Sequence, residues 1–167
     1  MPNNPQVILP GRYSLIARTL TLLIKEGQVL LQKAPPTKKI WANYYNGVGG
    51  HVENQEDIYA SAKRELLEES GLECADLGLR GIITIEVQKA QGILLFVFSG
   101  KEIQGQMRSS AEGDLEWVDI TKIKNLHVVE DIPLLLDMLT KQKALFYGHY
   151  AYDENGKLSA NFTYQSQ

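Results

Sequence analysis

Stretches of aliphatic and β-branched residues, separated by short polar segments, follow one another along most of the chain and predict a fold rich in β-strands. Turn residues join several of these strands into hairpins: Gln91-Gly92 is predicted as one turn, and Asn155-Gly156 lies in the last. The predicted strands are 13–24, 29–32, 79–87, 93–98, 115–118, 146–152 and 158–164, with a further short strand starting at Asn46.

A helical spacing interrupts the strands in the first half of the chain. At about 100° per residue, Tyr59, Ala62 and Leu66 fall on one apolar stripe. Asp57 is predicted as the N-cap of this helix, and Gly71 suits a C-cap in the left-handed conformation. The stripe therefore predicts an amphipathic helix that packs one face against a sheet.

The remaining segments are predicted from their polar, proline and glycine content. Residues 1–11 form an irregular N-terminal arm, 33–45 a long loop and 101–113 a mobile loop. A helical turn is expected at 121–125 and a second amphipathic helix at 131–144. No repeat or linker divides the chain, so 1–167 is interpreted as one domain.

The first predicted helix carries Glu65, Glu68 and Glu69 at spacings of three and four, which place the three acids on one face. Like charges so spaced repel each other by roughly 0.2–0.5 kcal/mol per pair. One interpretation is a solvated acidic face. The other is a site for Mg²⁺, or alternatively Mn²⁺, because such cations prefer carboxylate oxygens. Glu65 and Glu69 lie beside the apolar stripe, which favours the metal site.

The segment Gly50–Leu72 resembles the Nudix box, a motif with nine specified positions. The resemblance implies an α+β fold, a Nudix-type α/β/α sandwich with a mixed β-sheet, and a hydrolase of nucleoside diphosphates linked to another group. In this chain the nine positions are Gly50, Glu56, Arg64, Glu65, Leu66, Glu68, Glu69, Gly71 and Leu72.

Roles for individual residues follow from this resemblance. It implies that Glu65, Glu68 and Glu69 are metal ligands, that Glu65 is also a candidate base, and that the carbonyl of Gly49 joins the metal shell. Glu56 is expected to pair with the neighbouring arginine of the box.

Two further residues are predicted to take part in catalysis. Arg64 is expected to orient the helix and its acids through the pair with Glu56, although a simple stabilising ion pair is compatible with the same contact. Glu112 is a candidate for a further catalytic and metal-binding acid from a later loop; the alternative is an exposed loop residue.

The C-terminal half is similar to the MutT-type branch that hydrolyses oxidised purine nucleoside triphosphates. The resemblance implies that Glu130 and Asp131 grip the purine edge and that Asn46 meets the base. Asp131 as a mere helix N-cap is the alternative. The sequence departs from these relatives at His127-Val128, where they carry a tryptophan, and in a longer loop between Gln32 and Asn46.

That loop carries basic and aromatic residues. Lys33, with Lys38 and Lys39, could receive phosphates, and Trp41 could stack on a base. The alternatives are a solvated loop and a hydrophobic cover over the sheet.

Composition limits the partners. The net charge of −3 argues against a general nucleic-acid surface, so the expected partner is a small-molecule nucleotide. A single cysteine, Cys74, excludes an internal disulfide and fits the cytoplasm. The first ten residues lack the features of a signal peptide, and no apolar run is long enough to cross a membrane. Monomer and homodimer both remain open.

The favoured prediction is Mg²⁺-dependent hydrolysis of a nucleoside triphosphate, with an oxidised purine such as 8-oxo-dGTP, to the monophosphate and pyrophosphate. The alternatives are another nucleoside diphosphate derivative, such as ADP-ribose or a dinucleoside polyphosphate, and a Nudix module that binds nucleotides without catalysis.

Overall fold

The computed structural model describes residues 9–164. Its helices are α1 (Ile58–Ser70), the short 3₁₀ helix η1 (Ile120–Asn125) and α2 (Ile132–Lys141). Its strands are β1 (Ser14–Lys25), β2 (Gln28–Lys33), β3 (Tyr45–Asn46), β4 (Leu72–Cys74), β5 (Gly78–Glu86), β6 (Gln91–Gly100), β7 (Ile103–Gly105), β8 (Asp114–Asp119), β9 (Phe146–Tyr152) and β10 (Leu158–Tyr164).

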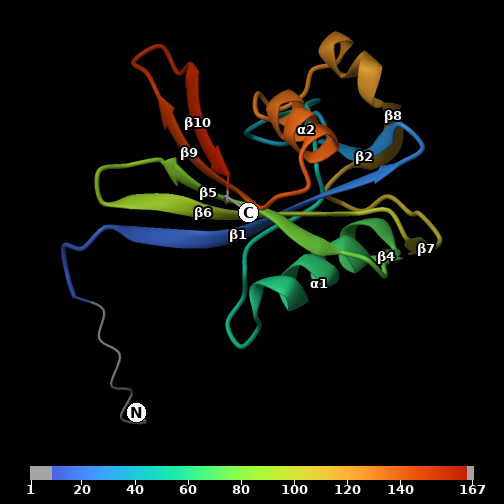
Figure 1. Cartoon of the computed structure of the whole chain (residues 1–167), viewed down its shortest axis with the longest axis horizontal. Helices are drawn as coiled ribbons and strands as arrows, with labels where there is room; N and C mark the ends of the chain where they lie inside the picture. Colours follow the sequence, from blue (N-terminus) through green and yellow to red (C-terminus); the bar gives the residue numbers. More distant parts are fainter. Residues whose placement is uncertain (1–8, 165–167) are drawn as a thin grey trace.

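Within the described residues, eight strands form the main sheet, in the order β10-β9-β5-β6-β1-β2-β3 with β8 also paired to β2. The β1–β6 and β5–β9 pairs are parallel and the other pairs in this sheet are antiparallel. Helix α1 lies on one side of the sheet and α2, with η1, on the other (Figure 1). The predicted α+β sandwich with a mixed sheet is confirmed.

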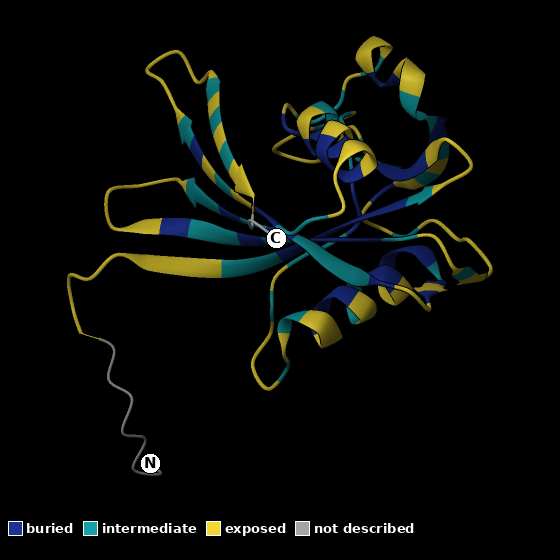
Figure 2. Cartoon of the chain, in the orientation of Figure 1, coloured by how far each residue is buried: buried dark blue, intermediate teal, exposed yellow. Residues whose placement is uncertain are grey.

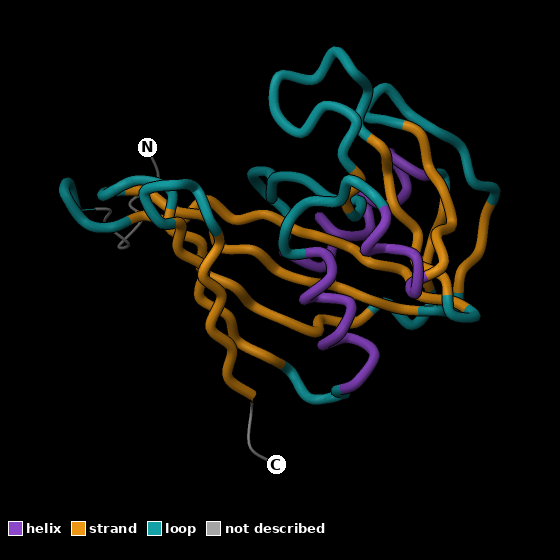
Figure 3. Tube along the Cα trace, turned by 90° about the horizontal axis from the view of Figure 1, so that it is seen from above, coloured by secondary structure: helices purple, strands orange, loops and turns teal. Residues whose placement is uncertain are grey.

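Side chains that alternate along β1 divide the hydrophobic core into two parts. Leu20 and Leu22 pack with Leu135 of α2, and we call this side of the sheet the α2 face. Leu23 packs with Leu66 of α1 on the opposite side, the α1 face. The long strands extend beyond both helices, and their ends are exposed (Figures 2 and 3).

A glycine-rich segment lies beside β1. Strands β1 and β2 pair only near their hairpin, and further along β1 the backbone instead bonds to residues 48–52. The Thr21 amide donates to the Val48 carbonyl at 2.6 Å, and the Thr19 amide donates to the Gly50 carbonyl at 2.9 Å. This arrangement holds the start of the Nudix-like segment against the centre of the sheet.

The ends of α1 are those that the sequence predicts. The Asp57 carboxylate accepts hydrogen bonds from the amides of Tyr59 and Ala60, at 2.9 and 2.8 Å, and Gly71 ends the helix with φ of 71°. Ala62 is buried as predicted, whereas Tyr59 is 44% exposed. The apolar stripe is therefore shorter at its N-terminal end than the periodicity predicts.

Other elements differ from the predictions. The loop predicted at 101–113 is wrong at Ile103–Gly105, which forms β7 with the unpredicted β4 as its partner. Strands of three residues are too short to give a recognisable alternation. Gln91 and Gly92 belong to β6, so the turn lies before them. Helix α2 ends at Lys141 because Gln142 is extended.

Residues 1–8 of the predicted N-terminal arm lie outside the described residues. In the described part of the chain, no helix is both long and apolar enough to cross a membrane.

Candidate functional site

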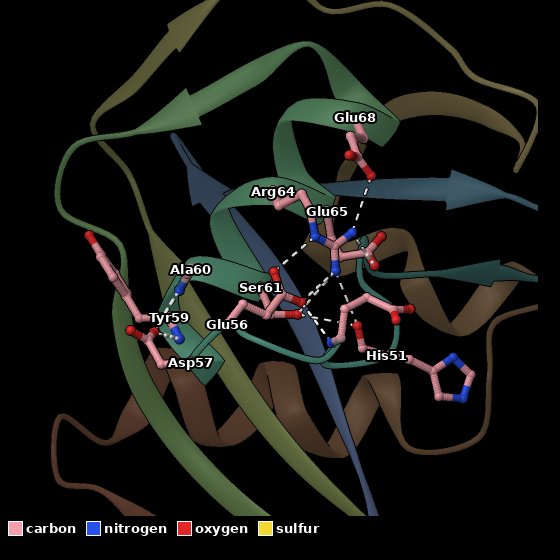
Figure 4. Close-up of polar contacts among 10 residues, drawn as sticks. His51, Glu56, Asp57, Tyr59, Ala60, Ser61, Arg64, Glu65 and Glu68 are labelled. Atoms are coloured by element: carbon pink, nitrogen blue, oxygen red, sulfur yellow. Dashed lines mark hydrogen bonds and ion pairs between the residues drawn. The ribbon is translucent and has the colours of Figure 1, made fainter. Parts of the chain in front are cut away.

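Arg64 and Glu56 form an ion pair with two hydrogen bonds in the candidate site. Arg64 Nη2 lies 2.7 Å from Glu56 Oε1, and Nε lies 3.0 Å from Oε2 (Figure 4). These hydrogen bonds lower the pKa of Glu56 to about 2. The pair expected from the sequence is present, and it fixes α1 to the loop before it.

The rest of the Arg64 guanidinium contacts acids and backbone. Nη1 donates to Glu65 at 2.9 Å and to Glu68 at 3.2 Å, and Nη2 donates to the His51 carbonyl at 3.2 Å. Hydrogen bonds to Glu56 and then to Glu65 raise the pKa of Arg64, so the guanidinium remains charged. One arginine therefore fixes two acids of α1 relative to the glycine segment.

The paired glycines let the acids lie directly against the backbone. A Cβ on Gly50 would be 2.4 Å from Glu65 Oε1, and a Cβ on Gly49 would be 2.1 Å from the Thr19 carbonyl oxygen. The Gly49 amide donates to Glu69 Oε2 at 3.3 Å. Any side chain at these positions would displace either an acid or strand β1.

Glu69 is only 9% exposed, although it is an acid. Burial raises its pKa to about 7, in spite of the hydrogen bond from Gly49, and the charges of Glu65 and Glu112 raise it further. The structure thus brings together Glu65, Glu69 and the backbone of Gly49, while Glu68 is 61% exposed at the rim.

Glu112 approaches the site from a separate loop. Its Oε2 lies 2.7 Å from Lys38 Nζ, so the loop after β7 is joined to the long loop between β2 and β3. Both charges influence the pKa of Glu69, with Glu112 raising it and Lys38 lowering it. Glu112 therefore lies near the acids of α1, but with a protein cation as its partner.

The donor set suits a hard divalent cation. Carboxylate oxygens such as those of Glu65 and Glu69 are the ligands that Mg²⁺ prefers. Within residues 9–164, no three acidic, histidine or cysteine side chains are arranged as a complete metal cluster. Glu65 and Glu68 both bond to Arg64, and Glu112 bonds to Lys38, so each of these three acids would exchange a protein cation for the metal.

A second polar centre lies on the α2 face. Asp131 is 9% exposed, and burial raises its pKa to about 6. Its side chain makes no capping hydrogen bond to α2, so a mere N-cap does not explain it. The nearby Tyr150 hydroxyl is buried without a hydrogen-bond partner among the described residues. Glu130 is exposed and accepts a hydrogen bond from the Leu158 amide at 3.2 Å.

Asn46 is placed next to this centre by the backbone. The Tyr45 amide donates to the His127 carbonyl at 2.8 Å, and the Val129 amide donates to the Tyr45 carbonyl at 2.9 Å. These bonds join β3 to the segment that leads into Glu130 and Asp131. The Asn46 side chain accepts a hydrogen bond from the Gly47 amide.

The other two residues predicted to bind substrate lie on the long loop and its edge. Lys33 Nζ lies 5.6 Å from the ring centre of Tyr45. Trp41 has a positive φ of 63°, is 45% exposed and contacts Tyr44 edge to face. Trp41 is therefore accessible rather than a cover over the sheet.

Two polar residues beside the site were not predicted. Arg18 and His51 are hydrogen bonded to each other between β1 and the glycine segment. Arg18 could have been noticed as the single charged residue in the apolar stretch 14–24. His51 could not have been identified as its partner, because nothing in the sequence places residue 51 next to residue 18.

Comparisons with known proteins identify the family of the chain. The NUDIX domain family model matches residues 15–138. The chain is similar to the oxidized purine nucleoside triphosphate hydrolases of Danio rerio (33% identity, 80% of this chain and 85% of that protein) and Mus musculus (33%, 81% and 86%). Among solved structures, MutT from Bacillus halodurans superposes with a TM-score of 0.77 at 26% identity, over 89% of this chain and 97% of that chain.

The chain therefore belongs to the NUDIX family. It is a Nudix hydrolase, an enzyme that acts on acid anhydrides, with MutT proteins among its structural neighbours.

Proposed function

We propose that the chain hydrolyses a nucleoside triphosphate with the help of Mg²⁺ and that its preferred substrates carry an oxidised purine. The observation that carries the proposal is the placement of Glu65 and Glu69 against the glycine backbone. The names of the two relatives at 33% identity support the substrate class.

Glu65, Glu69 and the Gly49 carbonyl would hold the metal, with Glu68 and Glu112 as further ligands after leaving their cationic partners. When bound, Mg²⁺ neutralises phosphate charge and makes a bound water more acidic. Arg64 keeps the helix and its acids in register with the backbone through Glu56 and His51. Glu65 is our candidate for the group that takes the proton of the attacking water.

In the proposed reaction the water oxygen bonds to a phosphorus atom, and the anhydride P–O bond between the α and β phosphates breaks. When the α phosphorus is attacked, pyrophosphate leaves with the electron pair of that bond; when the β phosphorus is attacked, the nucleoside monophosphate leaves with it. In either case the proton of the water passes to the Glu65 carboxylate. The products are the nucleoside monophosphate and pyrophosphate.

The acid pair would read the base. Burial raises the pKa of the Asp131 carboxyl, so protonating it costs less than for an exposed acid, and a protonated acid can donate a hydrogen bond to a carbonyl oxygen. Its neighbour Glu130, which accepts a hydrogen bond from the Leu158 amide, would accept from N–H groups of the base. Asn46 adds an amide that can both donate and accept.

The test is a panel of nucleotides assayed for Mg²⁺-dependent release of phosphate products. We expect 8-oxo-dGTP to be hydrolysed with a higher kcat/KM than dGTP, ADP-ribose or a dinucleoside polyphosphate. Faster hydrolysis of either of the last two would refute the substrate class. Binding without turnover of any nucleotide would refute the catalytic proposal.

Asp131→Asn separates base reading from catalysis. We expect it to lower kcat/KM for 8-oxo-dGTP about tenfold more than for dGTP, because one good hydrogen-bonding contact to a base is worth roughly 1–3 kcal/mol. Equal losses on both nucleotides would remove Asp131 from base recognition.

A further inference from the structure

Arg18 uses one edge of its guanidinium on a neutral partner. Its Nε and Nη2 atoms lie 3.1 and 2.9 Å from the same atom, His51 Nε2. Because a guanidinium only donates, Nε2 must be the unprotonated nitrogen of the ring. Among the described residues, Arg18 has no carboxylate partner, whereas Arg64 contacts three.

The histidine is itself held by α1. Its backbone carbonyl accepts hydrogen bonds from Arg64 Nη2 at 3.2 Å and Ser61 Oγ at 3.3 Å. Figure 4 shows the His51 ring directed away from Arg64 and Glu65. The backbone of His51 therefore belongs to the clamp around the acids, while its ring fixes Arg18 on the other side.

Arg18 lies on the face of the sheet that carries the second polar centre. Side chains alternate along β1, so Arg18 shares the α2 face with Leu20, which belongs to the same core cluster as Tyr150. In the strand register Arg18 is opposite Leu95 on β6, and Leu95 is opposite Ile83 on β5. Leu95 and Ile83 are buried in the core that packs against α2, so the row between Arg18 and Tyr150 is apolar, and Arg18 is a partly buried polar side chain beside it.

The separation between Arg18 and the second polar centre is close to the length of a nucleotide. Strand β9, which carries Tyr150, is three strands from β1, which carries Arg18. Because neighbouring strands are about 4.8 Å apart, roughly 14 Å separates β9 from β1. A nucleoside monophosphate whose base edge meets Asp131 has its phosphate at the other end of such a span. The acids of α1 lie across the glycine segment from Arg18, because Glu65 lies against Gly50 and Arg64 bonds to the His51 carbonyl.

From these observations we propose that Arg18, oriented by His51, binds the phosphate nearest the nucleoside. With Nε and Nη2 turned toward His51, the edge that includes Nη1 is available for two parallel hydrogen bonds to phosphate oxygens. Arg18 is a substrate-binding residue and His51 a positioning residue. The inference rests on the proposed function, since it takes the base to lie at Asp131.

The test compares a nucleoside 5′-monophosphate with the corresponding nucleoside, using the base that the substrate panel ranks first. Binding is measured by calorimetry in the presence of EDTA, so that neither turnover nor metal contributes. We expect Arg18→Met to weaken monophosphate binding about tenfold and to leave nucleoside binding unchanged. Asp131→Asn should weaken both ligands equally.

Arg80→Met is the matched control, because Arg80 lies on β5 and donates to the Gln142 carbonyl that follows α2. We expect wild-type affinity for both ligands. For His51, we expect His51→Ala to weaken monophosphate binding about threefold and His51→Gln, whose amide oxygen can accept from Arg18, to restore most of it. If His51 had a structural role alone, His51→Ala would weaken nucleoside binding as well.

Wild-type affinity of Arg18→Met for the monophosphate would overturn the proposal, as would equal loss for both ligands. Should Arg18→Met fold poorly, as judged by melting temperature, Arg18→Lys replaces it, because lysine keeps the charge but cannot form two parallel hydrogen bonds. Wild-type affinity of Arg18→Lys for the monophosphate would also contradict the proposal. These outcomes are distinct from a failure of the proposed function, which would appear in the substrate panel.

Discussion

Lys38 and Glu112 lie 2.7 Å apart although 74 residues separate them in the chain. If Glu112 binds the metal, this exposed ion pair competes with it. Lys38→Ala should therefore lower the Mg²⁺ concentration for half-maximal activity about twofold to fivefold, the range expected for an exposed pair. Titration of Mg²⁺ at saturating substrate measures this shift.

The control for this variant is Lys39→Ala, which removes the same charge from the next residue. An equal shift in both variants would mean that the overall electrostatic potential of the loop, rather than the Lys38–Glu112 ion pair, sets the Mg²⁺ dependence.

Glu68 contacts Arg64 but is mostly exposed, so its replacement should affect catalysis much more than stability. We expect Glu68→Gln to lower kcat at least about a hundredfold, as befits loss of a group that acts near the reacting phosphorus, with an unchanged melting temperature. Glu73→Gln, an exposed acid on β4, is the control. Full activity of Glu68→Gln would contradict its assignment as a metal ligand.

A methyl group at Gly50 should disturb the metal site selectively. The new Cβ would lie 2.4 Å from Glu65 Oε1, and a carboxylate at the end of a side chain can move aside. We expect Gly50→Ala to raise the Mg²⁺ concentration for half-maximal activity about tenfold and to change the melting temperature little. Gly78→Ala, where the nearest atom is 3.9 Å away, should behave as wild type. Unaltered Mg²⁺ dependence of Gly50→Ala would disprove the role of Glu65.

The buried Asp131 predicts a pH-dependent stability. Its carboxyl has a pKa near 6 when folded and near 3.8 when unfolded, so the folded state binds the proton more tightly. The resulting stabilisation is complete below the unfolded pKa and is lost as the pH rises through the folded pKa. Between pH 4 and pH 8 the wild type should lose about 2–3 kcal/mol relative to Asp131→Asn.

Urea unfolding in EDTA at the two pH values measures this difference. Asp137→Asn, which removes an exposed acid paired with Lys141 on the same helix, is the control for loss of a carboxyl that is not buried. A constant difference between wild type and Asp131→Asn would show that the carboxyl is not perturbed by burial.

The sequence predicted those parts of the fold that depend on local pattern. The caps at Asp57 and Gly71 are readable because each needs one residue type at one position, and the long strands are readable because their alternation spans many residues. The three-residue strands β4 and β7 were missed because they form only when tertiary contacts bring them together.

The residues of the site also fall into two groups, those predicted by a local motif and those that only the fold brings together. The acids of α1 follow from a motif of fixed spacing, and so does the pairing of Arg64 with Glu56. The Arg18–His51 contact and the Lys38–Glu112 pair depend on which strands and loops become neighbours, and no local pattern encodes that. The burial of Asp131 likewise depends on how the C-terminal hairpin packs against α2.

The parallel pairing of β1 with β6 has a consequence for the order of folding. Ser99 on β6 donates a hydrogen bond to the Leu22 carbonyl on β1 across 77 residues, and α1 with its glycine segment lies entirely between them. Pairing over such a separation is slow, because much chain must be ordered before any contact forms. Magnesium held between α1 and the glycine segment, which is itself hydrogen bonded to β1, would stabilise only the folded arrangement, so we expect it to retard unfolding.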